Sequence, residues 1–263
     1  MAKFCPLFSS SGGNAIYIGS GEDGILIDVG MNCKRTELAL YGIGVDPDSV
    51  KAVFVTHEHS DHIGGLKVFA AKHNIPVYAT EGTLDALTQR DYIKPETEIN
   101  TVSFDGNEIS SLLVKPFRTS HDAKESCGYV VLTPDGRKIA VCTDLGTVTD
   151  EVESAVSGCD LVLLESNHDV RMLENGPYPY PLIQRIKSDK GHLSNDSCSE
   201  LAVKLIKSGT TRLILGHLSE RNNFPELAYT TTYSALDTAG AKEDSDYILK
   251  VAKPVWDGKA LML

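Results

Sequence analysis

Three histidines and one aspartate lie within six residues directly after a hydrophobic segment, and no other feature constrains the chain as strongly. The segment Ala52–Thr56 has the β-branched, apolar character of a buried strand. It is followed by His57, His59, Asp61 and His62. Because successive side chains of an extended segment point to opposite sides, His57, His59 and Asp61 share one side. Zinc, iron and manganese accept imidazole and carboxylate ligands, so this motif predicts a metal site.

The rest of the chain alternates short apolar segments with amphipathic ones and shows no linker, repeat or break in composition. The expected strands include Ile25–Val29, Leu161–Glu165 and Arg212–Gly216. Helices are expected over His62–His73 and over Asn195–Lys207. Many strands in hairpin-like order, with helices between them, predict sheet-on-sheet packing with helices outside. We expect one domain over residues 1–263.

The motif that begins at His57 resembles the signature of the metallo-β-lactamase superfamily, His-x-His-x-Asp-His. Three later residues resemble the remaining metal motifs of that family, in the expected order: His121, Asp144 and His217. The resemblance therefore covers most of the chain. It implies a mixed α/β fold, the four-layer αββα sandwich of the metallo-β-lactamase type.

The resemblance also implies which side chains bind two divalent metal ions. One ion is assigned to His57, His59 and His121. The other is assigned to Asp61, His62 and His217, with Asp144 as the bridge between them. Two adjacent cations acidify a bridging water to hydroxide and stabilise the charge that develops on a substrate. A bridging aspartate is a suitable ligand for zinc or manganese, and it is compatible with iron as well.

Two residues outside the metal motifs indicate the reaction. His192 lies just before an expected helix, and Glu165 ends a buried strand. Matching positions in tRNase Z and its phosphodiesterase relatives hold a His/Glu pair that serves proton transfer beside the metals. The chain is also similar to the YycJ/WalJ-like branch, whose members are described as 5′-to-3′ DNA exonucleases. We therefore expect a phosphodiester hydrolase with Asp61, His192 and Glu165 as catalytic residues and with nucleic acid, DNA in particular, as substrate.

Two sets of polar residues are candidates for substrate contacts. The first belongs to a Gly/Ser-rich segment near the N-terminus and comprises Ser10, Ser11 and Asn14. The second set comprises His168, Ser194 and Asn195. Ser and Gly are also typical of surface loops, and Ser194 and Asn195 are also typical of a helix cap. The residues alone leave both interpretations open.

The composition bounds the cellular setting. No segment approaches the roughly 20 apolar residues of a membrane span, and the N-terminus lacks the pattern of a signal peptide. Six scattered cysteines are expected to be reduced core thiols. A cytoplasmic protein without a membrane partner is therefore expected. The net charge of −11 is weak evidence about nucleic acid, because bound cations neutralise clustered aspartates.

Other functions remain open beside the nuclease hypothesis. A thiolester hydrolase of the glyoxalase II type shares the His/Asp core, and so does a phosphodiesterase acting on small or cyclic substrates. Gly191-His192 together with Glu165 favours phosphodiesters over thiolesters. Residues 246–263 predict strand and turn, whereas glyoxalase-like proteins are expected to carry a helical C-terminal region. A flavo-diiron redox protein or a non-catalytic scaffold is disfavoured by the missing flavodoxin-like domain and by the full ligand set.

Overall fold

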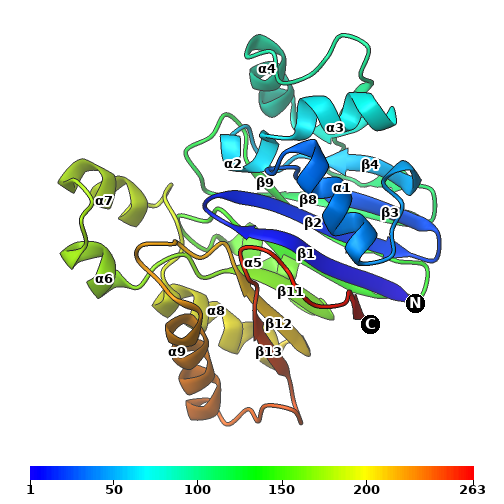
Figure 1. The fold of residues 1–263 in the computed structure, drawn as a ribbon. Helices are drawn as coiled ribbons and strands as arrows, with labels where there is room; N and C mark the ends of the chain where they lie inside the picture. The colour runs from blue at the N-terminus through cyan, green and yellow to red at the C-terminus, as the bar shows by residue number, and fades with distance from the viewer. The chain divides into compact units, whose positions relative to one another are not determined.

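The fold is mixed α/β, with two seven-stranded sheets and helices beside them (Figure 1). This computed structural model describes residues 1–263. The chain forms two units. Unit 1 comprises Met1–Pro116, Ala123–Arg137 and Pro254–Leu263, and unit 2 comprises Phe117–Asp122 and Lys138–Lys253. The mixed α/β class is confirmed, whereas a single domain over residues 1–263 stays a prediction.

Sheet 1 lies within unit 1 and has the order β14-β1-β2-β3-β4-β5-β6. Its strands are β1 (Ala2–Ser10), β2 (Gly13–Ser20), β3 (Asp23–Ile27), β4 (Val50–Phe54), β5 (Val77–Ala79), β6 (Ile99–Thr101) and β14 (Leu261–Met262). The turn-forming residues from Gly19 to Gly24 predict a hairpin, and the structure has it as β2–β3. Its turn contains Gly21 at φ 62°, a conformation that glycine adopts without strain. Strands β3 to β6 pair in parallel. Strand β1 is absent from the sequence prediction, because Pro6 and the serines at its end are typical of edges and loops.

The helices of unit 1 are α1 (Cys33–Gly42), η1 (Pro47–Ser49), α2 (Ser60–Ile63), α3 (Leu66–His73) and α4 (Glu81–Gln89). The helix expected over His62–His73 is therefore two helices, interrupted at Gly64 and Gly65. A Cβ atom on Gly65 would lie 1.9 Å from the carbonyl oxygen of Met31, so no other residue fits there without movement of the backbone. This close approach depends on a distant segment and has no signal in the local periodicity.

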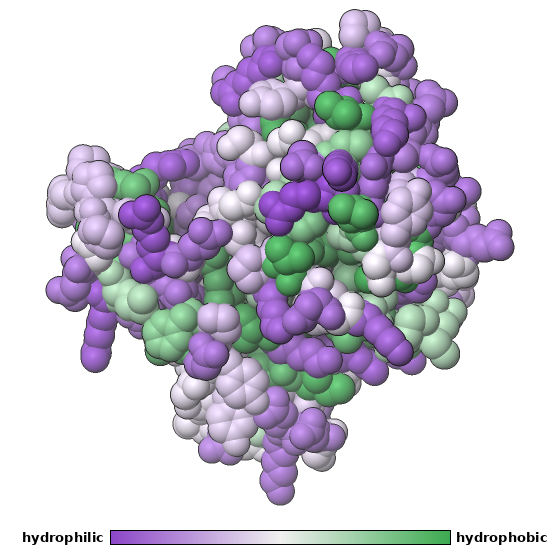
Figure 2. All heavy atoms as spheres, in the orientation of Figure 1, coloured by the Kyte–Doolittle hydropathy of each residue, from purple (hydrophilic) through white to green (hydrophobic).

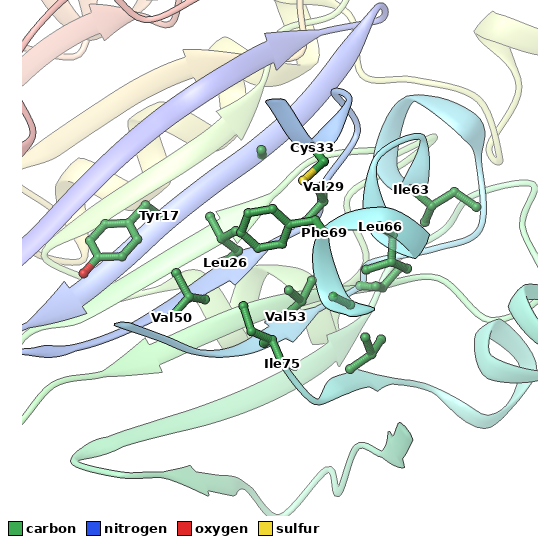
Figure 3. Packing of buried hydrophobic residues seen from close by; sticks show 14 of the residues in the cluster. Tyr17, Leu26, Val29, Cys33, Val50, Val53, Ile63, Leu66, Phe69 and Ile75 are labelled. Atoms are coloured by element: carbon green, nitrogen blue, oxygen red, sulfur yellow. The ribbon is translucent and has the colours of Figure 1, made fainter. Parts of the chain in front are cut away.

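The core of unit 1 lies between sheet 1 and helices α1 and α3. Figure 3 shows Phe69 and Leu66 of α3 directed toward Leu26 of β3 and Val53 of β4. All four side chains are fully buried. Burial of each such side chain contributes about 1.5–3 kcal/mol, which fixes α3 on the sheet and with it the segment that precedes this helix.

Unit 2 contains four parallel strands, β10 (Lys138–Cys142), β11 (Leu161–Glu165), β12 (Arg212–Gly216) and β13 (Ile248–Val251). Its helices are α5 (Asp150–Val156), α6 (Val170–Asn175), α7 (Tyr180–Lys187), α8 (Asn195–Lys207) and α9 (Pro225–Thr238). The predicted bounds of β11, β12 and α8 are confirmed. Because the strands are parallel, the residues that follow β10, β11 and β12 emerge at the same edge of the sheet. This edge carries Asp144, Glu165 and His217.

Three further strands are β7 (Asn107–Ile109), β8 (Leu112–Arg118) and β9 (Cys127–Leu132). A single strand is expected over Glu108–Val114, but the chain turns there at Ser110, whose φ is 51°. The residues Pro134-Asp135-Gly136 are typical of a turn and predict one between two strands. The structure confirms it, with Gly136 at φ 79° and its N–H donating to Thr133 O.

The six cysteines are all buried and none forms a disulfide, as the sequence predicts. On the face shown in Figure 2, hydrophobic side chains gather around α1, where Leu38 is 61% exposed and Tyr41 is 59% exposed. None of the helices combines the length and the apolar composition of a transmembrane helix.

Candidate metal centre

The residues after β4 bring the four predicted ligands of unit 1 together. His57 and His62 are fully buried, whereas the Asp61 side chain is 23% exposed. The ring centroids of His57 and His62 lie 4.1 Å apart. His57 Nε2 lies 3.1 Å from His59 Nδ1, and His62 Nε2 lies 3.3 Å from Asp61 Oδ2. The interruption between α2 and α3 positions Asp61 and His62 on the short helix α2, next to the strand end.

Asp28 and Thr56 orient the two buried rings from the opposite side. His62 Nδ1 donates to Asp28 Oδ2 at 2.7 Å, and the Thr56 hydroxyl donates to the same oxygen at 2.8 Å. His57 Nδ1 lies 3.0 Å from Thr56 Oγ1 and donates to it, because the Thr56 proton is already engaged. Both rings therefore carry their proton on Nδ1 and present Nε2 as the metal-binding atom.

Asp28 is a functional residue that the sequence analysis missed. It is fully buried, and its backbone adopts φ 62°. Burial raises the pKa of Asp28, and the neighbouring His62 opposes that rise. A signal does exist in the sequence, since this carboxylate interrupts the apolar run Ile25–Val29. A buried acid in a hydrophobic strand needs a partner, and here the partner is a predicted metal ligand.

The N-terminal candidates fall in and around the β1–β2 hairpin. The Asn14 amide donates to Ser10 O at 3.0 Å, and its Nδ2 lies 3.4 Å from Asp61 Oδ2. Ser10 is buried and its hydroxyl accepts from Gly12 N, so it stabilises the turn. Ser11 is exposed at the tip of the turn. The structure thus places Asn14 beside a predicted ligand, whereas Ser10 and Ser11 shape the hairpin.

In unit 2 two predicted ligands follow parallel strands, whereas His121 follows β8. Asp144 and His217 adopt left-handed backbone conformations, with φ of 60° and 54°. Such conformations cost about 1–3 kcal/mol in a non-glycine residue and cluster at functional sites. Asp144 Oδ1 lies 3.5 Å from His217 Nε2 and 3.7 Å from His121 Nε2. His121 Nδ1 donates to Gly191 O at 2.9 Å, so this ring too presents Nε2 to the carboxylate.

The predicted His/Glu pair of unit 2 is a direct hydrogen bond. His192 Nδ1 lies 2.8 Å from Glu165 Oε1, and Glu165 is fully buried. The His192 side chain is 20% exposed, so the imidazole reaches toward solvent while the carboxylate does not. One ligand atom each from Asp144, Glu165, His192 and His217 lies within 4.8 Å of the others.

The remaining candidates belong to a buried polar network beside this pair. Ser194 caps α8 by accepting from Ser197 N, and Ser166 Oγ donates to Asn195 Oδ1 at 2.6 Å. The Asn223 amide lies 2.8 Å from the same Asn195 oxygen. His168 is 2% exposed, its Nδ1 has no hydrogen-bond partner, and burial lowers its pKa to about 4. These residues therefore support the strand-end loops of unit 2, with His168 as a neutral ring.

The donor chemistry of both units fits divalent metal ions. His57 Nε2 and His59 Nδ1 face each other at 3.1 Å, close to the spacing of about 3.3 Å between nitrogen ligands of a tetrahedral ion. Each of the buried imidazoles His57, His62 and His121 is held through its other nitrogen by an oxygen atom. This arrangement is typical of metal-binding histidines.

Comparison with known proteins decides the family. The model of the β-lactamase superfamily domain matches residues 24–218. An exodeoxyribonuclease YycJ from Bacillus anthracis is 36% identical over 245 residues, which is 90% of this chain and 90% of that protein. The chain belongs to the metallo-β-lactamase superfamily. Within it, an exodeoxyribonuclease WalJ from Streptococcus pneumoniae is 35% identical over 240 residues, covering 90% of this chain and 89% of that one.

The fold of this metallo-β-lactamase superfamily member also matches solved structures. Human tRNase Z, short form, aligns with a TM-score of 0.63 and 18% identity, covering 84% of this chain and 93% of that chain. The predicted superfamily, its YycJ/WalJ-like branch and the fold class are confirmed. Membership in this family of hydrolases, together with the His/Asp donors of each unit, makes the chain a metal-dependent hydrolase.

Proposed function

We propose that this protein is a binuclear metal-dependent exonuclease that hydrolyses DNA from the 5′ end. The observation that carries the proposal is the hydrogen bond between His192 and the buried Glu165. It supports a proton-transfer role at His192, next to the predicted ligands Asp144 and His217. The relatives named exodeoxyribonuclease YycJ and WalJ, which match nine-tenths of the chain, support DNA as the substrate.

The proposed metal ligands are the seven side chains of the family pattern. They are His57, His59, Asp61, His62, His121, His217 and Asp144, with Asp144 as the proposed bridge. When bound, two zinc or manganese ions supply an acidified water as nucleophile and neutralise charge on the phosphate. The family pattern supports this assignment, and so do the orienting hydrogen bonds of the buried imidazoles.

The proposed role of His192 is to give a proton to the oxygen that leaves phosphorus. Its Nδ1 is held by Glu165 Oε1, so the proton transfer is proposed at Nε2, on the far side of the ring. Glu165 is a positioning residue, because its burial excludes contact with substrate. Asp61 is proposed as both ligand and catalytic residue, and the amide of Asn14 holds its carboxylate at the site.

The test is a comparison of substrates with the full-length protein. Single- and double-stranded DNA and RNA, labelled at either end, are incubated with the protein and Mn²⁺ or Zn²⁺, and S-lactoylglutathione is assayed in parallel. We expect mononucleotides or short products from the 5′ end of DNA and negligible thiolester cleavage. Thiolester cleavage without phosphodiesterase activity would assign the protein to the glyoxalase II type. Cleavage of small or cyclic phosphodiesters alone would retain the chemistry and change the substrate.

A further inference from the structure

A second group of metal-binding side chains lies between α1 and α3 in unit 1. It consists of Cys33, Glu37 and His73, and one potential ligand atom of each lies within 4.8 Å of the others. Cys33 and Glu37 are four residues apart and therefore share one face of α1. His73 is the last residue of α3. None of these residues belongs to the predicted catalytic ligands.

The spacing of the three atoms suits a tetrahedral ion. Cys33 Sγ lies 3.2 Å from Glu37 Oε1, and His73 Nε2 lies 2.9 Å from the same oxygen. Around a tetrahedral Zn²⁺ with bonds of about 2.0–2.3 Å, ligand atoms lie about 3.3–3.6 Å apart. Outward shifts of a few tenths of an ångström therefore admit the ion. Such shifts are within the freedom of the Glu37 side chain.

A carboxylate fixes the histidine in the orientation that a metal requires. His73 Nδ1 lies 2.5 Å from Asp48 Oδ1 and donates to it. This holds a proton on Nδ1 and turns Nε2 toward Cys33 and Glu37, where Nε2 donates to Glu37 Oε1 until a metal ion replaces its proton. The same carboxylate–histidine–metal arrangement orients ligands in zinc proteins.

The surroundings suit a thiolate–metal bond that is shielded from water. Cys33 is 9% exposed, and Figure 3 shows it at the edge of the core beside Val29 and Phe69. The Phe69 ring lies 4.8 Å from the His73 ring, measured between centroids.

In the structure without a metal ion, the ammonium group of Lys72 pairs with the carboxylate of Glu37. Its Nζ lies 2.7 Å from Glu37 Oε1, the oxygen that also accepts from Cys33 and His73. The Lys72 side chain is 57% exposed, so it can move into solvent when a divalent ion takes over the negative charge. Lys72 is therefore the competitor of the metal at this position.

We propose that Cys33, Glu37 and His73 bind one thiophilic divalent cation, Zn²⁺ in particular, and that this ion joins α1 to α3. Binding forms bonds to Cys33 Sγ, Glu37 Oε1 and His73 Nε2, and a water molecule completes the four ligands. The protons of the Cys33 thiol and of His73 Nε2 pass to solvent, and the Lys72 ammonium leaves the carboxylate. The segment before α1 and the residue before α3 both contact the loop of the predicted ligands. Val29, which precedes α1, donates its N–H to His62 O, and Gly65, which precedes α3, donates its N–H to Val29 O.

Cobalt(II) is the probe that separates this site from the catalytic ligands. A Co²⁺–thiolate bond gives a charge-transfer absorption in the near ultraviolet, which imidazole and carboxylate ligands do not give. Because none of the proposed catalytic ligands is a cysteine, the band distinguishes a cysteine-containing site from the catalytic one, and the cysteine variants assign it to a residue. The full-length protein is stripped with a chelator, titrated with Co²⁺ and followed by absorption, with circular dichroism as the check on folding.

We expect the band in the wild type and its loss in Cys33→Ser and in His73→Gln. Cys159→Ser, which alters a buried cysteine of unit 2, is the matched control and keeps the band. Lys72→Met should bind Co²⁺ about tenfold more tightly, because it removes a competing positive charge. Lys67→Met alters a lysine of the same helix that pairs with Asp91, and it should leave the affinity unchanged.

Two outcomes overturn the proposal. One is the absence of the band in wild type and Lys72→Met at saturating Co²⁺. The other is a band that persists in Cys33→Ser. If Cys33→Ser does not fold, His73→Gln and Lys72→Met decide the question, because glutamine keeps a polar side chain at position 73 and the Lys72 side chain is largely exposed. Equal affinity in Lys72→Met and Lys67→Met would also contradict the proposed competition.

Discussion

His192 Nδ1 and Glu165 Oε1 form a hydrogen bond of 2.8 Å. The second oxygen of this buried carboxylate accepts from the backbone N–H groups of Leu145 and Leu193, at 2.8 and 2.9 Å. Glu165 therefore cannot rotate without breaking three hydrogen bonds. One acid at the end of β11 thus fixes the histidine and also the loops that follow β10 and precede α8.

His192→Ala should keep the bound metals and lose turnover of DNA on the order of 10²–10⁴-fold, the usual contribution of a general acid. The loss should be smaller on bis(p-nitrophenyl) phosphate, because nitrophenolate leaves without a proton. Steady-state rates on both substrates and elemental analysis measure this. Loss of a metal ion in His192→Ala would instead make this residue a ligand.

Glu165→Gln should lower the turnover number on DNA with little change in KM.

Asp144→Ala should bind fewer transition-metal ions than the wild type and lose nearly all activity, since it removes the proposed bridge. Elemental analysis of protein purified without chelator gives the metal content. Asp196→Ala, which changes an exposed acid in the first turn of α8, is the control and should keep both properties. Wild-type metal content and turnover in Asp144→Ala would refute the assignment.

Asp28→Asn should weaken metal binding about 10–100-fold, the usual effect of removing the orienting partner of a metal-binding histidine. Asparagine tolerates the left-handed backbone of this position, so the substitution tests the charge and not the backbone. Competition with a chromogenic chelator measures the affinity. Asp23→Asn, at the half-buried start of β3, should show the wild-type value. An unchanged affinity in Asp28→Asn would limit Asp28 to a structural role.

His168 should make the protein less stable in acid. Burial lowers its pKa from 6.5 to about 4, so between these values the unfolded chain takes up a proton that the folded chain does not. The free energy of unfolding therefore falls as the pH falls through this window, by up to about 3 kcal/mol. Thermal midpoints at about pH 7 and about pH 5 should differ less in His168→Gln than in the wild type. Equal shifts in the two proteins would contradict the neutral, buried ring.

The sequence alone determined the features that local patterns encode. The apolar runs of β11 and β12 and the capped, amphipathic α8 have the bounds that the sequence predicts. The order and spacing of the His/Asp motifs are enough to identify the superfamily from the amino-acid sequence. The Glu165–His192 hydrogen bond follows from the family resemblance and is confirmed by geometry.

Only the tertiary structure decided the contacts between distant segments. The division of one expected helix at Gly64 and Gly65 depends on the carbonyl of Met31, and the orientation of His62 depends on Asp28 from another strand. Cys33 and His73 each fit an ordinary core or terminal position in the sequence, and only the packing of α1 on α3 brings them together. Periodicity and capping act over a few residues, whereas these contacts join residues far apart in the chain, so no local signal specifies them.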